Sequence, residues 1–156
     1  MKMNRRILTA LQFLMLFSAT QCFAQTFGPG PEDEVNAMFE PTKRAVFLID
    51  KGDVGTAWDE ASKILQDRTS RLIFISVLKG MRATAGEVKS RKFKDIGFLQ
   101  DMPNAPRGRY AAAFFDTDFS RVKAEEKLVF YKDGTHWRLA GYFLSKRQVA
   151  TGHDTK

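Results

Sequence analysis

The stretch that decides the fold runs from residue 110 to residue 144, where three segments follow one another: YAAAFFDTDF (110–119), KLVFY (127–131) and WRLAGYFL (137–144). These segments are dense in aromatic and aliphatic residues, a composition typical of strands. Asp133-Gly134 separates the last two and favours a tight hairpin, because such turns need residues that tolerate positive φ. The weakly alternating stretch 88–99 precedes them. We therefore predict four consecutive strands in an antiparallel sheet.

The residues before this sheet favour helices. Apolar side chains recur at three- and four-residue spacing over residues 35–49, 54–65 and 72–81. Pro41 should restart or kink the first helix. Asp53 can cap the second helix, and Thr69 or Ser70 can cap the third. The third helix is apolar over a wide arc, so we expect it to be the most buried. Helices grouped before strands predict an α+β domain, with N-terminal helices packed on a curved antiparallel four-stranded sheet.

The first residues have the order of a secretory signal peptide. Lys2, Arg5 and Arg6 form a basic start, residues 7–19 are mostly apolar, and Cys22-Phe23-Ala24 prepares a cut after Ala24. The apolar run is shorter than the roughly 20 residues that span a bilayer, which disfavours a retained membrane anchor. We therefore expect a periplasmic or secreted protein with no transmembrane anchor after processing.

Cysteine and charge limit the classes of function. Cys22 is the only cysteine, and lipid attachment there is disfavoured because Gln21 stands where a bacterial lipoprotein needs a small residue. Cleavage after Ala24 leaves no cysteine, which excludes disulfides and thiolate metal sites. It also lowers the formal charge from +7 to +4. Because export leads away from nucleic acid and no phosphate-binding loop or zinc signature occurs, we expect no nucleic-acid partner and no cofactor.

We divide the chain into four parts by composition. The predicted signal peptide is followed by a lead-in whose glycines and prolines break regular structure, so it is expected to be flexible. The last ten residues are polar and without periodicity, which is typical of a frayed terminus. The parts are a signal peptide (1–24), a flexible lead-in (25–31), a single α+β domain (32–146) and a disordered tail (147–156).

The predicted central strands carry apolar side chains on both faces. The helices can cover only one face. The other is either a binding surface or the outside of a curved sheet that is partly covered on both sides. The leading hypothesis is a non-enzymatic binding or interaction module for an unknown protein or a small amphiphilic ligand, on the sheet or at the mouth between sheet and helices. The residues expected to contact it are Phe114, Val129, Tyr131 and Tyr142.

Short motifs recur in order across the predicted domain. They are Trp58, Arg82, Gly86, Arg91, Pro103, Pro106, Gly108, Tyr110, Phe114, Thr117, Phe119, Glu126, Asp133-Gly134, Trp137-Arg138 and Gly141-Tyr142-Phe143. In this order and spacing they resemble the bacterial family catalogued as domain of unknown function 4019, over about residues 35–144. The resemblance implies a short exported or periplasmic protein and supplies no catalytic residues. Arg107-Gly108-Arg109 departs from the acidic turn that is often found there. The layout is also similar to the cystatin-like and nuclear-transport-factor-like cones, a fold analogy without a function.

Two alternatives to a binding module stay open. Asp116 and Asp118 lie two apart on a strand and so face the same side, where buried paired carboxylates can serve acid–base chemistry. This favours a small pocket hydrolase or isomerase, although exposed carboxylates beside basic residues are the simpler explanation. The other alternative is a structural homodimer through the sheet face.

A run of basic residues is the remaining candidate site. It could attract an anionic partner, or it consists of solvated charges at a helix end and on an edge strand. The two histidines are His136 in the predicted hairpin and His153 in the tail, too far apart in the pattern for a metal site. We assign no catalytic residue and no metal ligand. The basic residues are Lys79, Arg82, Lys89, Arg91, Lys92 and Lys94.

Overall fold

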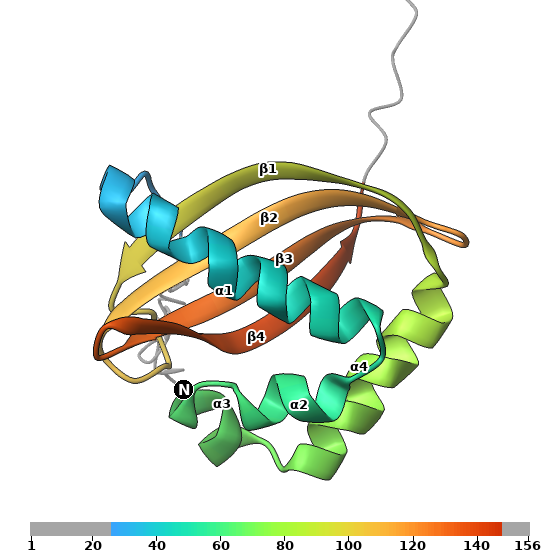
Figure 1. Ribbon diagram of the computed structural model, residues 1–156, viewed down its shortest axis with the longest axis horizontal. Coiled ribbons are helices and arrows are strands. Elements are labelled where there is room, and N and C mark those ends of the chain that lie inside the picture. Colours follow the sequence, from blue (N-terminus) through green and yellow to red (C-terminus); the bar gives the residue numbers. More distant parts are fainter. Residues whose placement is uncertain (1–25, 148–156) are drawn as a thin grey trace, which may run out of the picture.

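A computed structural model describes residues 26–147 of the protein (Figure 1). The predicted signal peptide and the predicted tail beyond Arg147 lie outside the described residues. Within the described part, no helix combines the length and the hydropathy needed to cross a membrane. In chain order the elements are α1 (Glu32–Asp50), α2 (Val54–Asp59), α3 (Lys63–Arg68), α4 (Arg71–Ala85), β1 (Val88–Gln100), β2 (Arg109–Phe119), β3 (Lys123–Asp133) and β4 (His136–Lys146).

The strands form one antiparallel sheet in the order β1-β2-β3-β4, so each strand pairs with its neighbour in the chain. The β3–β4 hairpin turns at Gly134, whose φ of 60° favours glycine, as the Asp133-Gly134 motif predicted. Figure 1 shows a bent sheet with α1 lying across its inner face and α2, α3 and α4 on its lower side. The α+β class with a curved antiparallel four-stranded sheet is confirmed. The likeness to the cystatin-like and nuclear-transport-factor-like cones stays a prediction.

The main hydrophobic core lies between the helices and the inner face of the sheet. Ala111, Ala113, Leu128 and Phe130 of the two central strands are at most 1% exposed. Small side chains on β2 beside large ones on β3 let these layers interdigitate with the helices. The helix residues packed against them are Met38, Ala45, Leu48, Ile49, Val54, Ala57, Phe74 and Leu78.

The helical region differs from the prediction in two places. α1 continues through Pro41 without a restart, which was one of the two effects predicted there; the other effect, a kink, stays a prediction. The predicted second helix is divided into α2 and α3, because the backbone N–H of Ser62 donates to the carbonyl of Leu139 on β4 (2.8 Å) and not to a helical carbonyl. The Ser62 side chain then caps α3. Asp53 and Ser70 cap α2 and α4, as predicted.

The prediction that the third helix is the most buried is wrong. Of the 15 residues of α4, only Phe74, Leu78 and Ala85 are buried. Leu72 and Ile73 are exposed. α4 packs mainly against α2 and less against the sheet. One side of its apolar arc therefore faces solvent.

The outer face of the sheet is covered by the chain itself. Tyr110, Ala112 and Val129 are buried there. Of the two explanations for the apolar strands, a sheet covered on both sides therefore describes this part of the face, whereas Phe143 of β4, on the same side, is 49% exposed. The covering residues come from the lead-in, α3 and the β1–β2 connection, and include Phe27, Ile64, Met102 and Ala105.

The lead-in, which we expected to be flexible, contributes to this cover. Gly28 exchanges two backbone hydrogen bonds with Phe98 on β1, at 2.9 and 2.7 Å. Phe27 then meets Phe114 edge to face, with 6.0 Å between the ring centres. Residues before α1 are thus part of the packed structure.

This arrangement predicts that Phe27 stabilises the fold although it precedes the first helix. We expect Phe27→Ala to lower the free energy of unfolding by about 1–2 kcal/mol, since the lost ring is partly buried. Phe47→Ala is the matched control, because Phe47 is 53% exposed on α1, and its cost should stay below about 0.5 kcal/mol. Urea denaturation followed by circular dichroism measures both. Equal effects of the two substitutions would show that the lead-in does not cover the sheet in solution.

Candidate functional site

A carboxylate lies within the apolar inner face of the sheet. Glu126 on β3 lies on the same face of the strand as Ala124, Leu128 and Phe130, and it is 1% exposed. Burying a carboxylate costs free energy unless it is paired and hydrogen-bonded. The side chains around Glu126 are therefore the first place to look for a site.

Four side chains donate to the Glu126 carboxylate. Arg91 donates from Nε at 2.6 Å and from Nη2 at 3.2 Å, and Arg82 donates from Nη1 at 3.2 Å. The Tyr142 hydroxyl donates to Oε1 at 2.6 Å, and the Thr117 hydroxyl donates to Oε2. Each carboxylate oxygen accepts at least two of these bonds, so the buried charge is fully satisfied.

Asp50, the last residue of α1, joins the two arginines from the helix side. It accepts from Arg82 at 2.8 Å and from Arg91 at 2.6 and 3.0 Å. Burial alone would raise the pKa of Asp50, but hydrogen bonds and charges from the two arginines outweigh it and hold the pKa below its usual value. Burial would lower the pKa of Arg91, and the two carboxylates raise it further than burial lowers it. We call Asp50, Arg82, Arg91, Thr117, Glu126 and Tyr142 the Glu126 cluster.

The Glu126 cluster joins the helices to the sheet and offers no free acid or base. Burial raises the pKa of the Tyr142 hydroxyl, and the charge of Glu126 raises it further, so Tyr142 stays a donor. Two carboxylates face two guanidinium groups, which leaves the cluster neutral. Its members come from α1, α4 and all four strands. The cluster therefore ties the helices to the sheet at one point.

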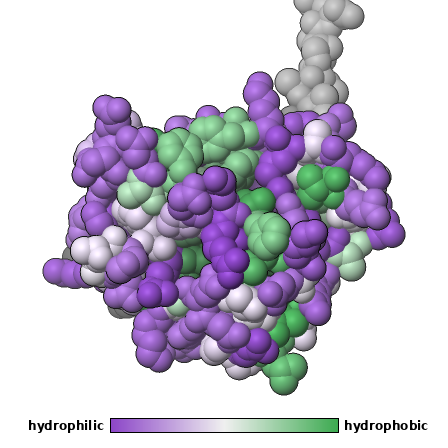
Figure 2. Space-filling model, viewed as in Figure 1, coloured by the Kyte–Doolittle hydropathy of each residue, from purple (hydrophilic) through white to green (hydrophobic). Residues whose placement is uncertain are grey.

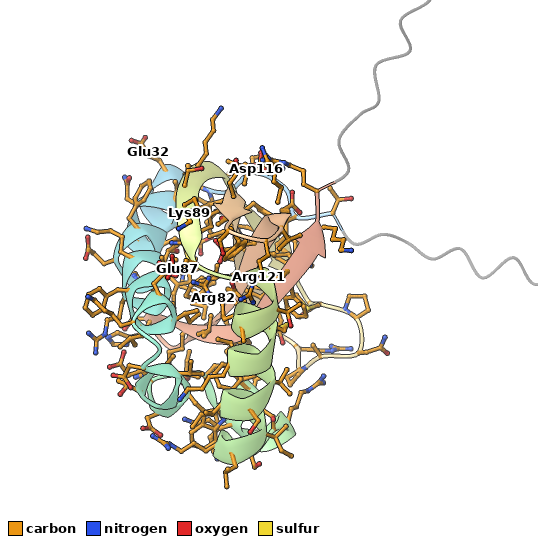
Figure 3. The ribbon with its side chains drawn as sticks, turned by 90° about the vertical axis from the view of Figure 1, so that its right-hand side faces the viewer. Glu32, Arg82, Glu87, Lys89, Asp116 and Arg121 are labelled. Atoms are coloured by element: carbon orange, nitrogen blue, oxygen red, sulfur yellow. The ribbon has the colours of Figure 1, made fainter. Side chains whose placement is uncertain are left out.

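An apolar groove lies between the C-terminal half of α4 and the ends of β3 and β4. We call it the α4–β4 groove; its volume is about 510 Å³. Figure 3 looks onto α4 and shows Arg82 and Arg121 near the end of this helix. Two of the lining residues are charged, and both are cationic. The lining residues are Gly80, Met81, Thr84, Ala85, Arg121, Val122, Ala124, Leu144, Ser145 and Lys146.

A second cleft shares Arg121 with this groove. It has a volume of about 540 Å³ and is also lined by Asp50, Arg82 and Glu87. Charges of both signs line it, and two of them already belong to the Glu126 cluster. Four of its lining residues are charged, against two in the α4–β4 groove, so this cleft is the more polar of the two.

The four residues predicted to contact a partner lie on two sides of the sheet. Phe114, Val129 and Tyr131 are together on the outer face, where Val129 is buried and the other two are half-buried. Tyr142 is on the inner face, within the Glu126 cluster. The structure thus brings three of them together and places the fourth behind the sheet.

The predicted basic patch is divided in the same way. Arg82 and Arg91 belong to the Glu126 cluster. Lys89 pairs with Glu87 at 2.9 Å, and Lys94 pairs with Glu125 at 2.6 Å. Of the six basic residues, Lys79 and Lys92 form no ion pair with any other described residue. Most of the charge expected to attract an anionic partner is therefore neutralised within the protein.

Asp116 and Asp118 have basic partners on the surface. Their side chains are 25% and 33% exposed. Asp116 lies 3.5 Å from Lys94, and Asp118 lies 2.8 Å from Arg147. Neither lines the α4–β4 groove or the second cleft. The pairing with basic residues agrees with the simpler explanation, but both side chains are half-buried and not exposed as it assumed.

The histidines do not meet in the part of the chain that the structure describes. His136 is exposed at the start of β4, beside Thr135. His153 lies outside the described residues. Between residues 26 and 147, no group of three or more side chains is arranged to hold a metal ion.

The sequence analysis missed the role of Asp50 and the burial of Glu126. A signal for Glu126 was present, because a charged residue at the apolar positions of an alternating strand points to a buried, paired group. Asp50 gave no such signal, since a helix end is an ordinary place for a carboxylate. The groove gave none either, because Met81, Val122 and Leu144 come from three separate elements.

The fold and this cluster define an α+β domain in which buried ion pairs and hydrogen bonds join the helices to the inner face of a bent antiparallel sheet. Residues 42–142 match the family model described as protein of unknown function (DUF4019). The chain belongs to this family, as the resemblance implied. The matched region contains every residue of the Glu126 cluster. A comparison with curated proteins found no match.

The Glu126 cluster predicts that removing its buried charge has a large effect on the stability of the fold. We expect Glu126→Gln to lower the free energy of unfolding by about 3 kcal/mol, because two guanidinium groups then share one carboxylate. Glu125→Gln is the matched control, since Glu125 is a neighbouring, more exposed residue paired with Lys94; its cost should stay below about 1 kcal/mol. Urea denaturation measures both. Similar costs for the two variants would contradict the role of the Glu126 cluster in joining the helices to the sheet.

The lowered pKa of Asp50 predicts a pH dependence with a definite sign. The folded state binds fewer protons at Asp50 than the unfolded state, so its contribution is complete at neutral pH. It is lost as the pH falls below about 4, the usual range of a carboxyl group. Asp50→Asn should lower stability at pH 7 and flatten the loss of stability on acidification. Asp67→Asn, an exposed residue paired with Lys63, should leave the acid-induced loss unchanged.

Proposed function

We propose that this protein is an exported, non-enzymatic binding module whose α4–β4 groove takes the apolar chain of a small anionic amphiphile. One observation carries the proposal: the groove has apolar walls and two cations, and no carboxylate is among its lining residues. An apolar chain and an anionic head group complement these two properties.

The size and walls of the groove support a small ligand. Its volume of about 510 Å³ falls within the roughly 300–1,000 Å³ that is common for small-molecule sites. Met81 and Leu144 are partly buried and pack against the main core, which holds the walls in place. A Cβ atom added at Gly80 would meet nothing within 4 Å, so the space above this turn of α4 is free.

The charges of the groove support an anionic head group. Arg121 and Lys146 line the groove from the β2–β3 turn and from the end of β4. Arg121 donates from Nη1 to the carbonyl of Ala83, which directs its guanidinium along the end of α4. A carboxylate or phosphate between these two cations would gain charge-assisted hydrogen bonds.

The chemistry of the lining residues supports binding without catalysis. The polar side chains of the groove are the hydroxyls of Thr84 and Ser145 and the two cations. A nucleophilic hydroxyl needs an adjacent base, and no carboxylate or histidine lines this groove. Asp116 and Asp118, the residues of the hydrolase or isomerase alternative, lie elsewhere with basic partners.

The remaining alternatives have less support. A homodimer through the sheet face would need a wide apolar area on the outer face, where the chain already covers Tyr110, Ala112 and Val129 and the exposed Phe143 lies beside Lys127. The signal-peptide pattern of residues 1–24 supports export with cleavage after Ala24. An amphiphile is therefore the occupant that we favour for the exported domain.

Calorimetric titration of the chain from Gln25 with dodecanoate, below the concentration at which it forms micelles, tests the proposal. We expect one molecule to bind per chain, and dodecyltrimethylammonium, with the same chain length and the opposite charge, to bind at least about fivefold more weakly. Gly80→Phe should weaken dodecanoate binding about tenfold by filling the groove. Ser76→Phe adds the same ring to α4 outside the groove and should not. The proposal fails if dodecanoate does not bind, or if both variants bind it as the unsubstituted chain does.

A further inference from the structure

α4 presents a second apolar surface that the fold does not use. Leu72, Ile73 and Val77 are 75%, 60% and 56% exposed. Large apolar side chains exposed together on one helix are uncommon unless they meet a partner or a lipid surface. Figure 2 shows an apolar area at the lower end of the molecule, where α4 begins in the view of Figure 1.

These residues continue into the α4–β4 groove. Ile73, Val77, Gly80 and Thr84 are spaced by four, three and four residues, so they lie along one line of the helix. The last two also line the groove. We call these four residues, with Leu72 beside them, the α4 stripe. The part from Ile73 to Thr84 is about 16 Å long at the rise of an α-helix.

The unpaired charges around the α4 stripe have one sign. α4 contains no aspartate or glutamate, and of its three cations Arg71 pairs with Asp59 at 2.8 Å and Arg82 belongs to the Glu126 cluster. Lys79 forms no ion pair with another described residue, and Arg121 and Lys146 stand at the groove. An apolar stripe flanked by unpaired cations is the pattern of a helix that lies at the surface of an anionic membrane.

We propose that α4 docks on an anionic lipid surface through the α4 stripe, so that the α4–β4 groove opens at the lipid and receives an amphiphile from it. This inference rests on the proposed function, because the stripe leads into the ligand groove. Leu72, Ile73 and Val77 enter the interface between head groups and acyl chains, and the cations stay at the head groups.

The same charges argue against a second copy of this chain as the occupant. Two copies that met through the α4 stripe in a two-fold contact would bring the Lys79 of each, near the middle of α4, close to that of the other, with no carboxylate on α4 to balance them. Like charges in close approach are repulsive. An anionic lipid surface offers the opposite sign over the whole length of the helix.

Cosedimentation of the chain from Gln25 with vesicles tests the inference. We expect binding to vesicles of equal parts phosphatidylglycerol and phosphatidylcholine, and at least about tenfold weaker binding to phosphatidylcholine alone. The double variant Ile73→Asp and Val77→Asp should lose at least about tenfold in affinity for the anionic vesicles. Its circular dichroism and its dodecanoate affinity should be unchanged, because neither residue lines the groove. Phe47→Asp changes an exposed apolar residue of α1 outside the α4 stripe. It is the matched control and should bind vesicles as the unsubstituted chain does.

The results separate this inference from the proposed function. The inference is overturned if the unsubstituted chain does not bind anionic vesicles, or if the double variant binds them equally well. The proposed function stands in either case when dodecanoate still binds. Self-association of the chain that the double variant abolishes would also overturn the inference, because the stripe would then be a contact between copies.

Discussion

The structure depends on one constraint, the buried charge of Glu126. A carboxylate at this depth is tolerated only when every lone pair is engaged and opposite charge is near. Arg82 arrives from α4, Arg91 from β1 and Asp50 from the end of α1, and the hydroxyls of two further strands complete the set. One point of the molecule therefore fixes the ends of two helices against the sheet.

The Glu126 cluster also explains why the α4–β4 groove is left beside it. α4 is held at its C-terminal end by Arg82 and along its inner side by contacts with α2, and it does not lie flat on the sheet. The start of β3 and the end of β4 run past it, and Leu144 and Met81 both line the space between them. The same placement leaves Ile73 and Val77 in solvent. Groove and stripe are two consequences of one helix position.

The exposed apolar residues of this chain are not on the elements where the sequence led us to expect them. The strands look too apolar for a sheet with one solvated face, and the structure uses Phe27 and the β1–β2 connection to cover them. The surplus that stays exposed is on α4, which looks like a core helix because its apolar arc is wide. A wide arc satisfies two situations equally well, burial on both sides or burial on one side with a contact surface on the other.

The sequence by itself determined the α+β class, the four consecutive strands of an antiparallel sheet, the hairpin at Gly134 and the caps at Asp53 and Ser70. These follow from alternation, spacing and local hydrogen bonding, which involve residues close together in the chain. Only the tertiary structure decided which face of the sheet is covered and by what, where α4 lies, and that Asp50, Arg82 and Arg91 meet at Glu126. The hydrogen bonds of this cluster join residues up to 60 positions apart (Arg82 to Tyr142), and no local pattern records which distant charge will balance a buried one.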